Sequence, residues 1–311
     1  MKKTFRISLL ILLFLGITYS YLFYGTLDNE ILTLRAIRYL LCIFTGFTLS
    51  MNGALLQTVT QNILAEPYLV GISGGALIGY LLGLTLPIKS SFFLSIPAFI
   101  FALLGVLFVY TMSTGKQGIR SELIVLSGIF VNLFASSLLF LSAYILNISL
   151  DQIIYLLFGS MNIVLSSDEL PIFLFVLGLG FILELSLIFF SREFDLIATG
   201  SSEAKVTGVN PSRIKTIVLF ISSLTTAITV AMAGMVGFVG LVVPHITREL
   251  TGKRHIEHLP FLIFSGGIFL LISDFIAKSL FTFELPIGSI TALFGIPFFF
   301  ITLIKKRYEG F

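Results

Sequence analysis

Long apolar stretches recur along the whole chain, separated by short polar connections. Within each stretch the apolar residues are continuous rather than alternating with polar ones, which indicates helices rather than half-buried strands. Most stretches can cross about 30 Å of hydrocarbon, where the backbone must satisfy its hydrogen bonds internally. The pattern therefore predicts an all-α integral membrane protein. We place ten transmembrane helices at residues 7–24, 36–58, 69–86, 91–112, 122–146, 170–190, 215–234, 237–250, 259–276 and 286–304.

Two of the ten predicted spans are atypical. The span 69–86 carries many glycines, and the span 237–250 is short and contains Pro244. Small residues that recur every fourth position share one helix face, where a neighbouring backbone can approach closely. They are Gly71, Gly75, Gly79 and Gly83 in the first of these spans, and Gly46, Ser50 and Ala54 in the span before it. We interpret both faces as packing surfaces between helices.

The lysines and arginines predict the orientation, because cytoplasmic connections of membrane proteins are enriched in them. With the N-terminus in the cytoplasm, only four of the 19 fall outside, namely Arg35, Arg38, Lys89 and Lys278. The reverse orientation would invert this bias, so we predict that both termini are cytoplasmic. No linker or low-complexity segment divides the chain, and residues 1–311 are treated as a single transmembrane domain.

The composition excludes several functional classes. The chain is 57% hydrophobic and 11% charged, its mean hydropathy is +1.06, and its net charge of +3 is spread over many connections. This distribution gives no basic patch, so no nucleic-acid partner is expected. The single cysteine, Cys42, excludes an intrachain disulfide and is interpreted as an apolar core residue. The three histidines lack the ligand spacing of a metal site, so no metal is expected.

No enzyme motif is present in the sequence. A phosphate-binding loop requires G-x-x-x-x-G-K followed by Ser or Thr. The pairs Gly115–Lys116 and Gly252–Lys253 lack both the upstream glycine and the hydroxyl residue. We therefore expect a non-catalytic chain, with any ATP hydrolysis carried out by another subunit.

Asn52, Gln57, Asn132 and Glu184 are polar residues inside the apolar spans. An ionisable group at membrane depth is a functional candidate. Glu184, near the middle of the sixth predicted helix, has two interpretations. It is either a protonated carboxyl group that hydrogen bonds across the bundle, or the carrier of an ion-coupled secondary transporter that needs no ATPase. A third hypothesis for the whole chain is a purely structural subunit of a membrane assembly.

A series of segments covers most of the chain in a specific order and spacing. The segments are Arg35-Ala-Ile-Arg38, Ser50-Met-Asn-Gly-Ala-Leu-Leu-Gln57, Asn62-Ile-Leu-Ala-Glu-Pro67, Leu69-Val-Gly-Ile-Ser-Gly-Gly-Ala76, Gly200 to Asn210, Gly237-Phe-Val-Gly-Leu-Val-Val-Pro-His245, Asp274, Glu284-Leu-Pro-Ile-Gly288 and Thr291-Ala-Leu-Phe-Gly-Ile-Pro297. Together they resemble the permease subunits of vitamin B12, haem and iron-siderophore ABC importers, the FecCD-type family. Ile63 stands where the family usually has proline. Asn52 is an additional residue ahead of the glycine in the segment Ser50 to Gln57.

The resemblance implies a multi-pass protein of the bacterial inner or plasma membrane with ten helices. It implies a second permease subunit, as a homodimer or heterodimer, with the pathway between the two. Two ATP-binding subunits would hold ATP and Mg, and this chain would carry no cofactor. An extracytoplasmic binding protein would deliver the cargo, which the sequence does not identify among siderophore, haem and cobalamin.

The resemblance also suggests roles for residues at the outer side. Arg35 and Arg38 lie one turn apart at the start of the second predicted helix, so both can face the same aqueous patch. The family docks carboxylates of its binding protein at these two positions and at the position of Lys278. The alternative is ordinary interfacial snorkelling of long basic side chains.

Further roles follow from the resemblance on the cytoplasmic side and along the pathway. In the connection 191–214, a short coupling helix that ends at Gly208 is expected to contact the ATP-binding subunit. Its residues are Gly200, Glu203, Ala204 and Gly208. The cytoplasmic gate is expected at Asn62, Leu64 and Ser121, and Asn132 and Thr291 are candidates for lining the pathway.

Overall fold

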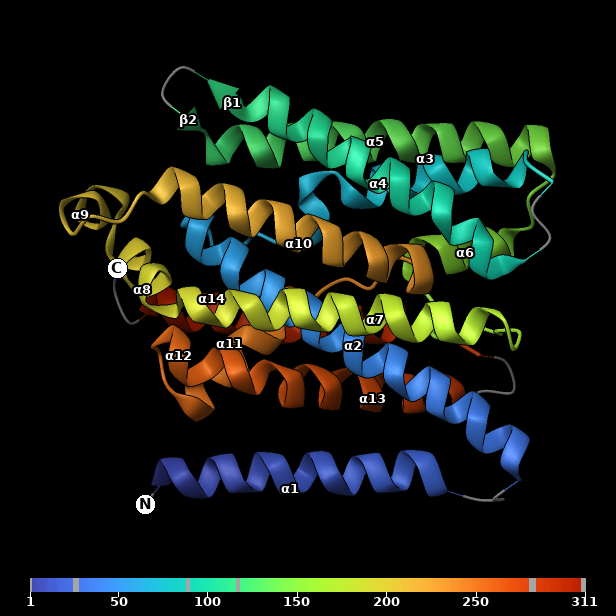
Figure 1. Cartoon of the computed structure of the whole chain (residues 1–311), viewed down its shortest axis with the longest axis horizontal. Helices are drawn as coiled ribbons and strands as arrows, with labels where there is room; N and C mark the ends of the chain where they lie inside the picture. Colours follow the sequence, from blue (N-terminus) through green and yellow to red (C-terminus); the bar gives the residue numbers. More distant parts are fainter. Residues whose placement is uncertain (1, 25–27, 88–89, 116–117, 280–283, 309–311) are drawn as a thin grey trace.

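The computed structural model describes residues 2–24, 28–87, 90–115, 118–279 and 284–308. Its regular structure is almost entirely helical, and the long helices lie side by side along one direction (Figure 1). The elements are α1 (Lys2–Phe23), α2 (Asn29–Thr60), η1 (Pro67–Val70), α3 (Ile72–Leu84), α4 (Ser91–Ser113), β1 (Thr114–Gly115), β2 (Gly118–Ile119), α5 (Ser121–Leu146), α6 (Leu150–Phe158), α7 (Glu169–Leu187), η2 (Ile188–Phe190), α8 (Ser191–Thr199), α9 (Ser201–Val206), α10 (Pro211–Ala233), α11 (Val239–Thr251), α12 (His255–His258), η3 (Leu259–Phe261), α13 (Leu262–Ser279) and α14 (Ile287–Tyr308). The two short strands pair antiparallel between α4 and α5, with Thr114 opposite Ile119.

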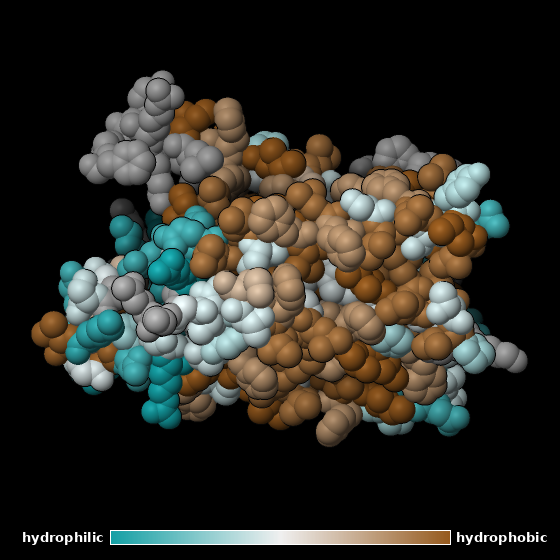
Figure 2. Space-filling view, turned by 90° about the horizontal axis from the view of Figure 1, so that it is seen from above, coloured by the Kyte–Doolittle hydropathy of each residue, from teal (hydrophilic) through white to brown (hydrophobic). Residues whose placement is uncertain are grey.

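The described part of the chain contains seven helices that are long and apolar enough to cross a membrane, and two shorter apolar helices. Figure 2 shows hydrophobic residues over most of one face, with hydrophilic residues gathered at the end that carries α9. Helix α1 begins and helix α14 ends at that same end of the bundle (Figure 1). This distribution is that of a multi-pass membrane protein.

Helix α2 forms the centre of the bundle. Its most apolar window is 89% buried, whereas that of α1 is 11% buried. The small residues of α2 permit this burial, because a methyl group on Gly46 would overlap the backbone of Gly266 in α13, and one on Gly53 would overlap Gly240 in α11. The predicted packing surface on this helix is therefore confirmed, and Cys42 is fully buried within it.

The glycine face of α3 packs closely against α4. A methyl group on Gly75 would overlap the carbonyl oxygen of Phe101, and one on Gly79 would overlap the carbonyl oxygen of Pro97. Gly71 precedes the helix with φ +83°, a conformation that side chains disfavour. The glycines thus allow two backbones to approach, which confirms their interpretation as a packing surface.

The two atypical spans contain short helices of 13 residues, α3 and α11, each preceded by irregular backbone. These two irregular segments contact one another. The carboxylate of Glu66 accepts a hydrogen bond of 2.6 Å from the backbone N–H of Phe238. The hydroxyl of Tyr68 accepts one of 3.0 Å from Val236. Two backbone N–H groups freed before α11 are therefore satisfied by side chains of the segment before α3.

Candidate docking, gating and coupling sites

Arg38 belongs to the first part of α2, a helix that begins at the end of the bundle opposite α9 (Figure 1), and it contacts several charged groups. Its guanidinium donates to both carboxylate oxygens of Asp274, at 2.9 Å from Nε and 2.7 Å from Nη2, and to Glu284 at 2.5 Å. Tyr21 donates its hydroxyl to Asp274 as well, at 2.5 Å. Lys278 lies 3.9 Å from the same carboxylate, whose side chain is only 1% exposed. Two of the three predicted docking residues therefore share one buried aspartate.

Arg35 is bonded differently. Its guanidinium donates to the carbonyl oxygens of Leu22, at 3.3 Å, and Tyr24, at 2.5 Å. Carbonyl oxygens carry no formal charge, and in the described part of the chain no carboxylate forms an ion pair with Arg35, whereas Arg38 shares its charge with Asp274. The docking role of all three residues remains a prediction. Sequence reasoning gave Asp274 no role, although an aspartate inside an apolar span, four residues before a lysine, was the signal.

The short helix α9 is at the hydrophilic end of the molecule, beyond the ends of the long helices (Figure 1). It starts after Gly200, which has φ +146°, and ends before Gly208, which has φ +86°. The N–H groups of Gly208 and Val209 donate to the carbonyl oxygens of Lys205 and Ala204, the Schellman pattern of helix termination. The predicted short helix and its end at Gly208 are therefore confirmed.

The side chains of α9 divide into an inner and an outer set. Ala204 is fully buried and belongs to the protein's own core, whereas Val206 is 89% exposed. Glu203 and Lys205 are exposed as well. An apolar side chain so exposed at a hydrophilic end is suited to a partner surface. Of the predicted coupling residues, Ala204 thus packs inside this chain, and Val206, which was not among them, presents an exposed apolar side chain. The coupling role of α9 remains a prediction.

The predicted gate residues Asn62 and Leu64 follow the end of α2. The side-chain oxygen of Asn62 accepts the backbone N–H of Leu64 at 2.9 Å, and its carbonyl accepts that of Ala65 at 3.1 Å. These bonds form a compact turn without the proline that the family usually has at Ile63. Leu64 is 48% exposed, which leaves its side chain available for a gate contact.

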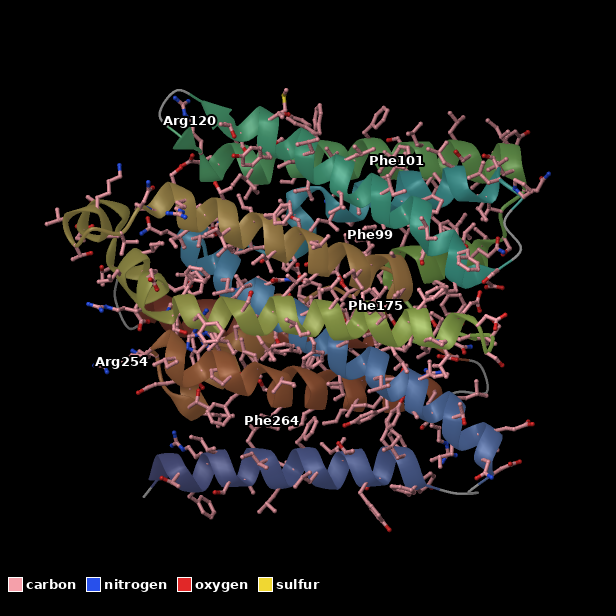
Figure 3. The ribbon with its side chains drawn as sticks, in the orientation of Figure 1. Phe99, Phe101, Arg120, Phe175, Arg254 and Phe264 are labelled. Atoms are coloured by element: carbon pink, nitrogen blue, oxygen red, sulfur yellow. The ribbon has the colours of Figure 1, made fainter. Side chains whose placement is uncertain are left out.

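The second part of the predicted gate lies at the start of α5. Ser121 is the first residue of that helix, but its side chain is outside the described part of the structure. Arg120 precedes it and is held by a backbone hydrogen bond of 3.1 Å to Ser113. Figure 3 shows Arg120 and Arg254 at the same end of the bundle, the end that carries α9. The role of Ser121 remains a prediction.

The two candidate lining residues are engaged within the subunit. Asn132 accepts from the hydroxyl of Ser73 at 3.0 Å and from the N–H of Gly74 at 2.9 Å, and it donates to the carbonyl of Tyr68 at 3.1 Å. It therefore caps the start of α3 from α5. Thr291 is fully buried and donates to Gly288. Their lining role remains a prediction.

Glu66 lies in the connection after α2, outside the spanning helices. Burial raises the pKa of its carboxyl group to about 7, although the hydrogen bond from Phe238 opposes this rise. Its ionisation therefore changes near neutral pH. This places a titratable group where the two irregular segments meet.

Glu184 is fully buried between three helices. It accepts a hydrogen bond of 2.5 Å from the hydroxyl of Thr225 in α10. Asn52 in α2 donates to the same hydroxyl at 3.0 Å and to Thr226 at 2.9 Å. The cluster connects α2, α7 and α10, which favours the interpretation of Glu184 as a cross-bundle hydrogen-bonding group.

Comparisons with known proteins agree along the whole chain. The FecCD transport family matches residues 5–305. The Fe(3+)-citrate import system permease protein YfmD of Bacillus subtilis is 34% identical over 295 residues, which cover 94% of this chain and 86% of that protein. The cobalamin import system permease protein BtuC of Halobacterium salinarum is 32% identical over 276 residues, which cover 88% and 73%.

A solved structure agrees in fold. It is described as a metal-chelate type ABC transporter in an inward-facing conformation, and it matches 98% of this chain and all of its own chain with a TM-score of 0.81 and 27% identity. The sequence match and the structural match thus cover the same helices, including the irregular segments before α3 and α11. This chain belongs to the FecCD transport family.

Proposed function

We propose that this chain is the membrane-spanning permease subunit of an ATP-driven importer, and that its cargo is a metal chelate or a cobalamin-type compound delivered by an extracytoplasmic binding protein. The family match over residues 5–305 carries the proposal. The names of the two relatives, an iron-citrate permease and a cobalamin permease, support the two cargo classes.

The proposed assembly contains two permease subunits, identical or related, and two ATP-binding subunits that bind ATP and Mg. This chain crosses the membrane ten times when α3, α11 and α14 are counted with the seven long helices, and both termini are cytoplasmic. The charge bias supports this orientation, as does the position of the start of α1 and the end of α14 at one end (Figure 1). The hydrophilic end with α9 is then the cytoplasmic end.

In the proposed mechanism, the permease supplies motion and a pathway rather than chemistry. Closure of the ATP-binding subunits displaces α9, whose exposed residues include Glu203, Lys205 and Val206. The displacement shifts helices as rigid bodies and opens one side of the pathway while closing the other. Arg35 at the outer end contributes positive charge for docking of the binding protein.

Reconstitution tests the proposal. The permease is purified with its ATP-binding subunit, placed in liposomes, and supplied with the loaded binding protein. Uptake is expected to require ATP, and the isolated permease is expected to hydrolyse none. Robust ATP turnover by the isolated chain, free of contaminating ATPase, or uptake driven by an ion gradient without ATP would contradict the assignment. Identification of the ligand that co-purifies with the binding protein then defines the cargo.

A further inference from the structure

Three side chains from separate elements form a hydrogen-bonded line near the cytoplasmic end. The carboxylate of Asp195 in α8 lies 2.6 Å from Nδ1 of His255 in α12 and accepts the backbone N–H of the same histidine at 2.9 Å. The other ring nitrogen, Nε2, lies 2.9 Å from the hydroxyl of Thr58 near the end of α2. His255 is only 4% exposed, and Thr58 only 9%.

The two ends of this line lie next to the moving parts of the proposed importer. Asp195 belongs to α8, which is separated from α9 only by Gly200. Thr58 precedes the turn at Asn62 by four residues, so it belongs to the helix end that carries the gate. A second contact runs in parallel, because the side chain of Gln61 donates to the carbonyl of Ile197 in α8 at 3.1 Å.

We propose that Asp195, His255 and Thr58 form a relay that transmits the displacement of α9 to the cytoplasmic gate. This inference rests on the proposed function, because it assumes that α9 receives the motion of an ATP-binding subunit. It assigns positioning roles to three residues outside the predicted coupling and gate sets. The relay acts through His255, which bonds to α8 on one side and to α2 on the other.

The geometry makes the histidine a stiff connector. An imidazole ring with both nitrogens bonded cannot rotate without breaking a hydrogen bond. The ring also packs between Phe194, at 5.7 Å between centroids, and His258, at 5.0 Å. Asp195 bonds both the side chain and the backbone of His255, so α8 cannot shift without moving α12. A displacement of α8 is therefore passed on to the end of α2.

The hydrogen count explains why the hydroxyl of Thr58 is needed. Its oxygen lies 2.9 Å from the carbonyl of Ala54 as well as 2.9 Å from the histidine. A hydroxyl has one proton to donate and can also accept. Because the carboxylate of Asp195 can only accept, Nδ1 carries the proton of the neutral ring and Nε2 is an acceptor, so the hydroxyl of Thr58 donates its proton to Nε2. Valine at this position has the same shape and cannot donate.

The relay is tested in the complete complex in liposomes, with its ATP-binding subunit and loaded binding protein. Thr58→Val removes the hydroxyl at constant shape, and Thr58→Ser retains it. Thr60→Val is the matched control, because in the described part of the chain the hydroxyl of Thr60 bonds only the carbonyl of Leu56, which belongs to the same helix. The measurements are cargo imported per ATP hydrolysed, co-purification of the ATP-binding subunit, and melting temperature.

We expect Thr58→Val to keep ATP hydrolysis within about twofold of wild type and to import at least about fivefold less cargo per ATP. Thr58→Ser and Thr60→Val should keep the wild-type ratio. Asp195→Asn should also lower the ratio, and the double variant with Thr58→Val should be no worse than the more impaired single variant, because both changes break one line.

An unchanged ratio in Thr58→Val would overturn the relay. If Thr58→Val lowered the melting temperature and the co-purification of the ATP-binding subunit in proportion to the loss of transport, the relay would also be overturned, because such a result indicates a folding defect. If the losses in cargo imported per ATP were additive in the double variant, Asp195 and Thr58 would have independent roles, and the relay through His255 would be rejected. These outcomes differ from failure of the proposed function, in which the wild-type complex itself shows no ATP-dependent import.

Discussion

Arg38 donates two hydrogen bonds to the carboxylate of Asp274, from Nε at 2.9 Å and from Nη2 at 2.7 Å. The aspartate side chain is 1% exposed and that of the arginine 16%. Removing one partner of a buried pair leaves an uncompensated charge, which typically costs about 3–5 kcal/mol. Because Arg38 retains some solvent and also contacts Glu284, we expect Asp274→Ala to cost about 3 kcal/mol, the lower end of that range.

The measurement is the free energy of unfolding in detergent. Asp151→Ala, at an exposed position in the first turn of α6, is the control and should cost less than about 1 kcal/mol. Arg38→Lys keeps the positive charge but cannot bind the carboxylate with two parallel hydrogen bonds, so its free energy of unfolding should lie between those of wild type and Asp274→Ala. Equal stability of Asp274→Ala and its control would mean that the pair does not hold α2 to α13.

The prediction for docking of the binding protein concerns Arg35 alone. Reversing the charge at Arg38 would also break its ion pair with Asp274, so an effect on docking could not be separated from an effect on folding. Arg35→Glu should weaken binding-protein affinity by about 1 kcal/mol at low salt, because a positive site becomes repulsive to acidic groups. The loss should shrink at high salt, since charges are screened over about 10 Å at 0.1 M.

Affinity in lipid nanodiscs at low and at high salt checks this docking prediction. Lys253→Glu, a charge reversal of the same size at the end that carries α9, is the control and should leave affinity unchanged. An Arg35→Glu variant that folds normally and binds as well as wild type at low salt would return Arg35 to a snorkelling role.

The coupling helix gives a prediction that separates contact from packing. Val206 is 89% exposed, so Val206→Glu should leave the melting temperature unchanged and weaken co-purification of the ATP-binding subunit. Ala204 is fully buried, so Ala204→Arg should lower the melting temperature, because a charge cannot enter the core without a partner. Gly200→Trp should also destabilise, since φ is +146° there. If Val206→Glu bound the ATP-binding subunit normally, α9 would not be the coupling contact.

The sequence predicted the bundle well because its signals are local. Hydropathy and glycine spacing depend on neighbouring residues, so the packing faces and the helix end at Gly208 were accessible. Helix boundaries were predicted less accurately, since α2 begins at Asn29 although its predicted span begins at residue 36. Its first turns carry Glu30 and Arg35, which lower the mean hydropathy without ending the helix.

What the sequence could not provide is pairing between distant residues. Asp274 lies 236 residues from Arg38, and His255 lies 197 residues from Thr58. No local pattern connects such positions. The helices α6 and α8, of nine residues each, are too short for a membrane-span window and were missed for that reason.

Glu66 gives a prediction for pH dependence. Burial raises the pKa of its carboxyl group from 4.5 to about 7, so the folded state favours the neutral acid. The associated stability is fully present below pH 4.5 and is lost as the pH rises through about 7. As the pH rises from 4.5 to about 7, the melting temperature of the wild type should therefore fall relative to that of Glu66→Gln. Glutamine keeps an acceptor oxygen for the N–H of Phe238 but does not ionise. Parallel profiles of the two proteins would contradict this.

The buried cluster around Glu184 decides between the two interpretations of that residue. Glutamine has the same shape and keeps the oxygen that accepts from Thr225, but it carries no exchangeable carboxyl proton. If Glu184 only bonds helices together, Glu184→Gln should retain ATP-driven import near the wild-type rate. Asn52→Ala, in contrast, removes the donor to Thr225 and Thr226 and should cost about 1–3 kcal/mol through unpaired buried groups.

The measurements for this cluster are initial uptake in liposomes, with and without a proton gradient, and stability in detergent. A structural cross-link predicts that Glu184→Gln imports normally and ignores the gradient, while Asn52→Ala is destabilised yet still imports at low temperature, because neither residue lies on the proposed route of coupling. An ion carrier predicts the reverse, since a carboxyl group that loads and releases a proton has no substitute in glutamine. Loss of gradient-dependent uptake in a stably folded Glu184→Gln variant would therefore reinstate the secondary-transport interpretation.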